Sequence, residues 1–158
     1  MDKLTHFNAA GEARMVDVGD KPNTARRAVA EGRICMQDET LQRIRDGNHR
    51  KGDVLGVARI AAIMAAKKTA ELIPLCHPLP LDAVDVTIEV DGPEALRIEA
   101  TAAATWRTGV EMEALTAAAV AALTVIDMLK AVERTLVVSD LRLESKSGGG
   151  RGDWTRPA

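Results

Sequence analysis

A chain of 158 residues can bury the core of a single domain, and a formal net charge of −2 gives no electrostatic bias toward nucleic acid. With 28% charged residues the chain is not expected to be disordered, and no apolar stretch predicts a membrane span or a signal peptide. Aromatic residues make up 2%, which argues against base-stacking platforms for RNA or single-stranded DNA. We expect one cytoplasmic domain over residues 1–158 that binds neither nucleic acid nor a membrane.

The cysteines, Cys35 and Cys76, lie far apart in the chain and form no CxxC pair. This spacing does not suggest an iron–sulfur cluster or a structural zinc site. Reduced thiols in a cytosolic protein are the simpler interpretation.

The first half of the chain predicts an arm, a strand and two helices. Residues 1–24 carry few apolar positions and read as an irregular arm, followed by a first strand at 26–36. Asp38 is a plausible N-cap for a short helix that ends at Gly47. Asp53 then starts a longer helix that runs to about Leu72, where Pro74 stops it. The apolar positions at helical spacing in this helix are Val57, Ile60, Ala61 and Met64.

The second half predicts an extended segment, two strands, a long helix and a last strand. Three prolines make residues 74–80 extended. Strict alternation predicts a strand at 83–90, and a returning strand follows at 95–104. The long helix spans roughly 110–132 and the last strand about 136–145, before a flexible Gly-rich tail at 146–158.

Without the arm and the extra short helix, the predicted order of elements is β-α-β-β-α-β. This order predicts an α+β, ferredoxin-like split βαβ fold, in which both helices pack on one face of an antiparallel sheet. The fold by itself implies no activity.

The long helix carries charged residues at both ends, with Glu111 and Glu113 at its start and Asp127 and Lys130 at its close. Asp127 follows Glu113 by 14 positions, close to four turns, so both point from nearly the same face, roughly 21 Å apart. Two copies running antiparallel would bring unlike ends together in composite sites. The residues small enough to allow a close approach of two such helices are Ala117, Ala118, Ala119, Ala121 and Ala122.

Each of these charges also has an ordinary explanation. Acidic residues at a helix N-terminus compensate the helix dipole, and Asp127 with Lys130 fits a surface pair at i,i+3. A partly buried Asp beside a Lys would instead have pKa values suited to proton transfer. His77 is a candidate wall residue on a stiff segment, and Lys51 is a candidate phosphate ligand on a loop that enters a helix. Lys67 and Lys146 fit surface positions as well as phosphate contacts.

Several motifs closely resemble the cyclic pyranopterin monophosphate synthase (MoaC) family of molybdenum cofactor biosynthesis. The motifs are LTH at 4–6, GEA at 11–13, MVDV at 15–18, KGDV at 51–54, LIPLCHP at 72–78, TGVEMEALT at 108–116, DMLKAV at 127–132 and KSGG at 146–149. They run in order along nearly the whole chain.

The resemblance implies a ferredoxin-like homohexamer, built as a trimer of dimers with sites at the dimer interface. It also implies rearrangement of 3′,8-cyclo-7,8-dihydro-GTP to cyclic pyranopterin monophosphate with release of pyrophosphate. It assigns acid/base catalysis to Asp127, Lys51 and Lys130. The implied substrate-binding residues are Leu75, Cys76, His77, Glu111, Met112, Glu113, Lys67 and Lys146. No cofactor is required by this assignment, and Mg²⁺ is a possible companion of the triphosphate.

Two further expectations complete the sequence analysis. Trp106 and Arg107 depart from the family pattern before Thr108, and we expect Trp106 to fill space beside the site. The alternative function is a non-catalytic oligomeric sensor of a nucleotide-like anion. The paired Asp127 and Lys130 distinguish the two, because a sensor gains little from a buried acid beside a Lys.

Overall fold

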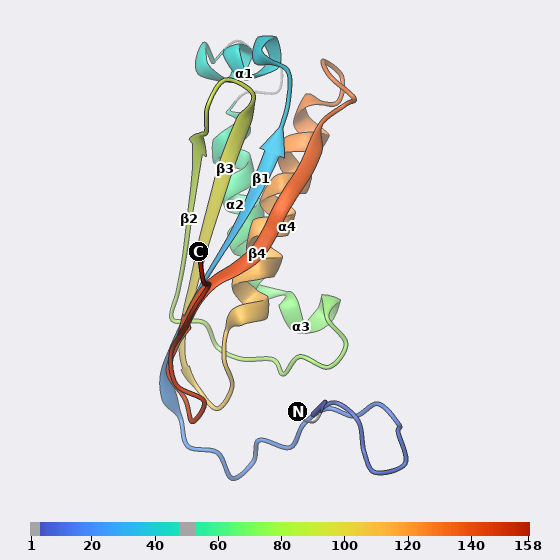
Figure 1. The fold of residues 1–158 in the computed structure, drawn as a ribbon, viewed down its shortest axis with the longest axis vertical. Coiled ribbons are helices and arrows are strands. Elements are labelled where there is room, and N and C mark those ends of the chain that lie inside the picture. Colours follow the sequence, from blue (N-terminus) through green and yellow to red (C-terminus); the bar gives the residue numbers. More distant parts are fainter. Residues whose placement is uncertain (1–3, 48–52) are drawn as a thin grey trace.

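The computed structural model describes residues 4–47 and 53–158, which form one antiparallel sheet with helices against one face (Figure 1). In chain order the elements are β1 (Thr24–Cys35), α1 (Asp38–Arg45), α2 (Val54–Lys67), α3 (Thr69–Leu72), β2 (Ala83–Val90), β3 (Ala95–Trp106), α4 (Glu111–Leu129), β4 (Val137–Ser147) and β5 (Trp154–Thr155).

The sheet has the order β2-β3-β1-β4-β5. The central strands β1 and β3 pair along their whole length, from Thr24 opposite Trp106 to Cys35 opposite Ala95. The first four strands and helices α2 and α4 reproduce the predicted ferredoxin-like arrangement. Strand β5 was not predicted, because two residues are too few to show a periodic pattern.

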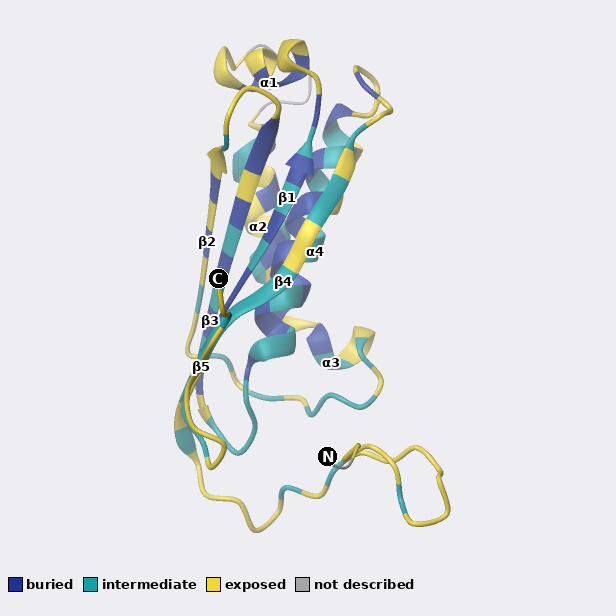
Figure 2. Ribbon diagram, viewed as in Figure 1, coloured by how far each residue is buried: buried dark blue, intermediate teal, exposed yellow. Residues whose placement is uncertain are grey.

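The alternation predicted for the strands is confirmed. Val86 and Ile88 are buried on the inner face of β2, while Asp85, Thr87 and Glu89 are exposed. Figure 2 shows buried positions recurring along β3 and β1, where Ile34, Leu96 and Ile98 are fully buried. The inner face of the sheet is therefore apolar and requires a helical cover.

Helix α4 supplies most of that cover through small side chains. Ala117, Ala118, Ala121 and Ala122 are all 0% exposed within the single chain, where α4 contacts α2, β1 and β3. The expectation that these alanines face a second copy is wrong, because the protomer itself uses them. By length and hydropathy alone α4 could cross a membrane, but half of that window is buried in the fold, as in a core helix.

The apolar positions predicted for α2 lie on its outer side. Val57, Ile60 and Met64 are 46, 60 and 54% exposed. The residues that α2 buries are instead Val54, Ala58, Ala62, Ala65 and Ala66. Two helices that pack closely need small residues between them, so the larger side chains are turned outward.

Three predicted boundaries are corrected by local hydrogen bonds. Asp53 lies at the start of α2 as predicted, and its Oδ1 accepts a hydrogen bond from Gly56 N at 2.9 Å. Asp38, by contrast, is already helical, and the cap position of α1 is Gln37. The long second helix ends at Lys67, because the Thr69 hydroxyl donates to the Ala66 carbonyl at 2.9 Å. Pro74 and Leu75 form a turn, closed by Cys76 N donating to Ile73 O at 3.1 Å, and the extended segment begins after it.

The N-terminal arm contains a small closed loop. Phe7 and Ala13 form an isolated bridge, and Asn8 Oδ1 accepts from Ala10 N and Glu12 N at 3.0 and 2.9 Å. Gly11 adopts a φ of +81°, which few other residues adopt readily. The arm is therefore irregular, as expected, but internally bonded.

A buried carboxylate fastens α1 to the loop that follows α4. Glu133 is 7% exposed, and its carboxylate accepts from Gln37 N at 3.1 Å and from the Thr135 hydroxyl at 2.7 Å. Burial raises its pKa, but hydrogen bonds from Thr40, Thr135 and Gln37 outweigh burial and hold the pKa below its ordinary 4.5. The ionised group thus stabilises the folded chain.

We predict that Glu133→Gln lowers the free energy of unfolding at pH 7 by about 1–3 kcal/mol, because it weakens a buried hydrogen-bonded network. Since the folded pKa is depressed, this contribution is present above 4.5 and is lost as the pH falls through the lower folded value. Urea denaturation at pH 7 and pH 3.5 measures both effects. The exposed Glu39→Gln is the control, and equal effects of the two substitutions would contradict the assignment.

Candidate functional site

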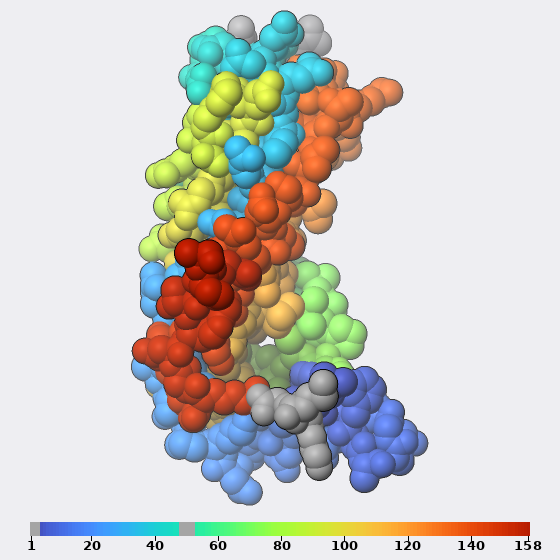
Figure 3. Space-filling view, in the orientation of Figure 1, coloured from blue at the N-terminus to red at the C-terminus, as the bar shows by residue number. Residues whose placement is uncertain are grey.

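A cavity of about 520 Å³ lies where α4 begins, a size suited to a small-molecule ligand. The arm, the segment after α3, the start of α4 and the end of β4 all contribute to its wall. Figure 3 shows the dark-blue arm crossing this end of the molecule, next to the green α3 segment. The chemistry-bearing residues that line the cavity are Thr5, His6, Lys21, Thr24, Arg26, Cys76, His77, Arg107, Glu111, Glu113, Lys146 and Arg151.

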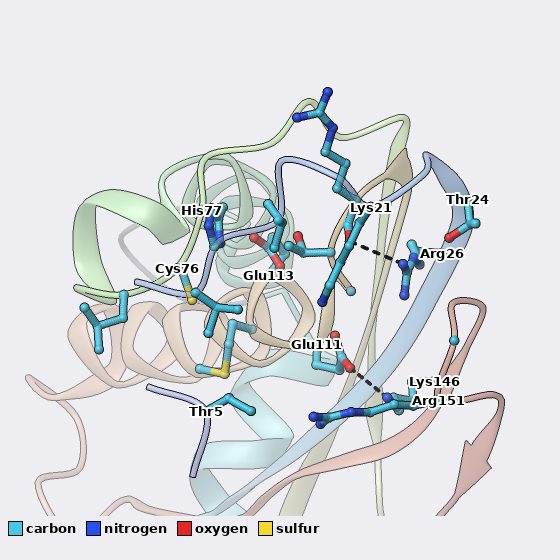
Figure 4. A pocket seen from close by; sticks show the side chains of 18 of the residues that line it. Thr5, Lys21, Thr24, Arg26, Cys76, His77, Glu111, Glu113, Lys146 and Arg151 are labelled. Carbon is cyan, nitrogen blue, oxygen red and sulfur yellow. Dashed lines mark hydrogen bonds and ion pairs between the residues drawn. The ribbon is translucent and has the colours of Figure 1, made fainter. Parts of the chain in front are cut away.

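Two carboxylates in the first turn of α4 line the cavity, as predicted, but in different surroundings. Glu113 is 5% exposed, whereas the side chain of Glu111 is 29% exposed and its carboxylate lies 3.3 Å from Lys146 Nζ (Figure 4). Gly109 makes room for Glu111, since a Cβ at that position would overlap its carboxylate. The backbone before α4 therefore determines where the carboxylate of Glu111 points.

The surroundings of Glu113 change its acidity. Burial raises its pKa to about 7; its own backbone N–H acts in the opposite direction, and the charge of Glu111 raises the pKa further. A carboxyl group with this pKa exchanges its proton near neutral pH. It suits a site that accepts a hydrogen bond or transfers a proton.

The residues of the 72–78 segment that were predicted to bind substrate line the same cavity as these carboxylates. Leu75, Cys76 and His77 line the cavity together with Met112. Burial, with the charges of Glu113 and Glu111, raises the pKa of the Cys76 thiol. A protonated thiol is a poor nucleophile, so Cys76 fits the substrate-binding role that the family resemblance implies better than a role in covalent catalysis.

Four cations at the cavity were not selected from the sequence: Lys21, Arg26, Arg107 and Arg151. Arg26 donates to the backbone carbonyls of Arg107 and Gly148 at 3.3 and 3.4 Å. Its Nε and the Thr24 hydroxyl are buried and have no hydrogen-bond partner among the described residues. Both residues line the cavity, so a ligand with anionic oxygens is a candidate partner for the two groups.

The Gly-rich turn after β4 makes room for Arg26. A Cβ on Gly149 would overlap the Arg26 guanidinium, and a Cβ on Gly148 would overlap the Ala25 carbonyl. The glycine run at 148–150 was therefore the signal that another group passes close to this backbone, but the sequence does not say which one.

Predicted site residues at the other end of α4 do not reach this cavity within one chain. Asp127 and Lys130 form a 2.6 Å ion pair whose side chains are 62 and 60% exposed. The start of α4 lies next to the cavity, and the helix runs from there toward the α1 end of the molecule (Figure 1). The partly buried Asp–Lys couple expected from the sequence is thus an exposed pair in the single chain.

Three further predicted positions have different outcomes. Lys67 lines a second cavity, of about 450 Å³, beside the start of β2. Lys51 lies outside the described residues. Trp106 packs against the hydrophobic core, so the expectation that it fills space at the site is wrong; Arg107, 5.9 Å from the Trp106 ring, lines the cavity instead.

The described residues, 4–47 and 53–158, contain no cluster of three or more His, Cys, Asp or Glu side chains that could hold a metal ion. The charged groups of the cavity are instead divided into two ends. Glu113, Cys76 and His77 lie at one end, and Arg26, Lys146 and Arg151 lie at the other, where Glu111 is beside Lys146 (Figure 4). This arrangement suits a ligand with a polar ring and an anionic tail.

Comparison with known proteins identifies the family of this chain. A family model described as the MoaC family matches residues 15–149. A protein of Chloroflexus aurantiacus named cyclic pyranopterin monophosphate synthase is 60% identical over 99% of this chain and 96% of its own length. Proteins with the same name from Thermomicrobium roseum and Brevibacillus brevis are 58 and 54% identical, over 99 and 98% of this chain and 95 and 97% of theirs. The chain belongs to the MoaC family.

Proposed function

We propose that this chain converts 3′,8-cyclo-7,8-dihydro-GTP to cyclic pyranopterin monophosphate and releases pyrophosphate, in molybdenum cofactor biosynthesis. The observation that carries the proposal is the two-ended cavity, in a chain whose relatives bear the name of that synthase over nearly their full length. The carboxylates of Glu113 and Glu111 would accept hydrogen bonds from the N–H groups of the purine-derived ring. The cations at the opposite end would hold the triphosphate.

The proposed chemistry needs proton transfer and charge stabilisation. Ring opening and recyclisation require groups that take up and return protons, a role we assign to Asp127 with Lys51 and Lys130. Departure of pyrophosphate requires positive charge near phosphoryl oxygens, which Arg26 and Lys146 would supply. The proposal assigns no resident metal or organic cofactor, and Mg²⁺ would enter with the triphosphate.

We also propose that the active unit is an oligomer in which two chains build each site. One chain would contribute the cavity with Glu113, and a second would contribute Asp127 and Lys130. Exposed apolar side chains on both helices, Ile60 of α2 and Leu123 of α4, each 60% exposed, support burial against another copy. A trimer of such dimers would form the homohexamer.

A mixing experiment tests the composite site. Co-expressed Glu113→Ala and Asp127→Asn chains should recover about a quarter of wild-type activity, because half of the dimers are mixed and each mixed dimer has one intact site. Steady-state turnover of affinity-purified mixed oligomers measures this recovery. Asp127→Asn mixed with Lys130→Ala is the control and should recover nothing, because both defects lie on the same side of the site. No recovery in the first mixture would contradict the shared site.

The catalytic assignment predicts losses of turnover without loss of folding. Asp127→Asn and Lys51→Ala should each lower kcat by about 10²–10⁴-fold, the usual contribution of a general acid or base. The assay incubates the cyclised GTP precursor with each variant, then reads released pyrophosphate and pterin fluorescence after oxidation. Exposed Asp85→Asn and Lys68→Ala serve as matched controls. Near-normal rates in both variants would remove these roles, and binding without turnover in the wild type would favour the sensor.

The raised pKa of Glu113 predicts a pH dependence. If its ionised form accepts hydrogen bonds from substrate, kcat/KM should rise with pH through an apparent pKa of about 7. This is the pKa of Glu113 in the enzyme without substrate. Glu113→Gln should abolish this inflection and lower kcat/KM at pH 8. Glu111→Gln should retain the inflection at a slightly lower pH, because one charge that raises the pKa is removed. An unchanged inflection in Glu113→Gln would assign it to another group.

A further inference from the structure

One ion pair connects two parts of the cavity wall. Glu111 lies in the first turn of α4, Lys146 lies near the end of β4, and the charged atoms are 3.3 Å apart (Figure 4). The two side chains are 29 and 25% exposed, and both line the cavity. Among the described cations that line this cavity, Lys146 is the one held by a carboxylate.

The backbones on both sides of this contact are fixed. Lys146 pairs with Ala28 of β1 on one side and with Trp154 of β5 on the other. The carboxylate of Glu111 folds back over Gly109, at the entry to a helix whose next turns are buried. A change in this ion pair therefore requires rotation of two side chains and no movement of the sheet or of α4.

An incoming phosphate chain competes with Glu111 for the same ammonium group. Its several anionic oxygens offer Lys146 more charge-assisted hydrogen bonds than one carboxylate does. Arg26 lines the same cavity and has a buried Nε that lacks a hydrogen-bond partner among the described residues. Once Lys146 turns to the phosphate, the oxygens of Glu111 become free to accept N–H donors from the ring. Binding of phosphate at the cation-rich end of the cavity thus prepares the other end to bind the ring.

We propose that Lys146 is transferred from Glu111 to the phosphate chain on binding, so that the two ends of the ligand are recognised cooperatively. The inference rests on the proposed function and adds to it which ligands bind fully and how the product is released. A ligand needs both a phosphate chain and ring N–H groups to bind fully. When pyrophosphate leaves, Lys146 returns to Glu111 and the hold on the product weakens.

Binding of inorganic triphosphate and of guanosine to the purified oligomer tests this transfer by isothermal titration calorimetry. Glu111→Gln should bind triphosphate about fivefold more tightly than wild type, because Lys146 no longer has a competing partner. Lys146→Met should bind guanosine about fivefold more tightly, because Glu111 is already free. Lys68→Met and Glu89→Gln, at exposed positions outside the cavity, are the matched controls and should leave both affinities near those of the wild type.

The double variant separates the transfer from general electrostatics. In the Lys146→Met background, Glu111→Gln should leave triphosphate affinity nearly unchanged. An equal gain in both backgrounds, or no gain in either, overturns the transfer. Turnover of the wild-type oligomer tests the other claim: turnover without coupling between the two variants removes only the transfer, whereas coupling without wild-type turnover removes only the proposed reaction.

Discussion

The close contact of α4 with α2 and with the sheet is the constraint on which the site depends. The alanines at 117, 118, 121 and 122 are fully buried, so α4 has little freedom to rotate or slide. Because these alanines face the interior, the first turn of α4 places the carboxylates of Glu111 and Glu113 in the cavity. The same rotation places Asp127 at the surface, 62% exposed, where a second chain can reach it. The packing of α4 thus determines where the charged side chains at both of its ends lie.

Burial also gives two neighbouring carboxylates different chemistry. Glu113 lies against apolar wall and thiol and holds its proton to about pH 7, whereas Glu111 is paired with Lys146. Glu111 and Glu113 are only two positions apart, but helix geometry directs their side chains differently because positions i and i+2 do not share a face. The cavity can therefore combine an exchangeable proton with a charge pair in a small volume.

The segments that form the cavity are far apart along the chain. The sheet brings the start of β1 beside the end of β4, which allows Arg26 to pass across Gly149 and to bond the Arg107 carbonyl. The C-terminal residues pair back on β4 at Lys146, so a segment expected to be a tail also fixes a cation of the site. The cation-rich end of the cavity is therefore formed by strand pairing.

The sequence by itself determined the fold class, the strands with their buried faces, the order of the helices, and the cavity-lining residues at 75–77 and 111–113. These follow from alternation, capping and local motifs, which act over a few residues. Tertiary structure decided what depends on neighbours: the outward face of α2 at Ile60, the inward alanines of α4, the pKa of Glu113 and the roles open to Arg26 and Arg107. Periodicity shows that a helix has an apolar face, but small and large side chains compete for the interior. Only the spacing between packed elements decides which of them is buried.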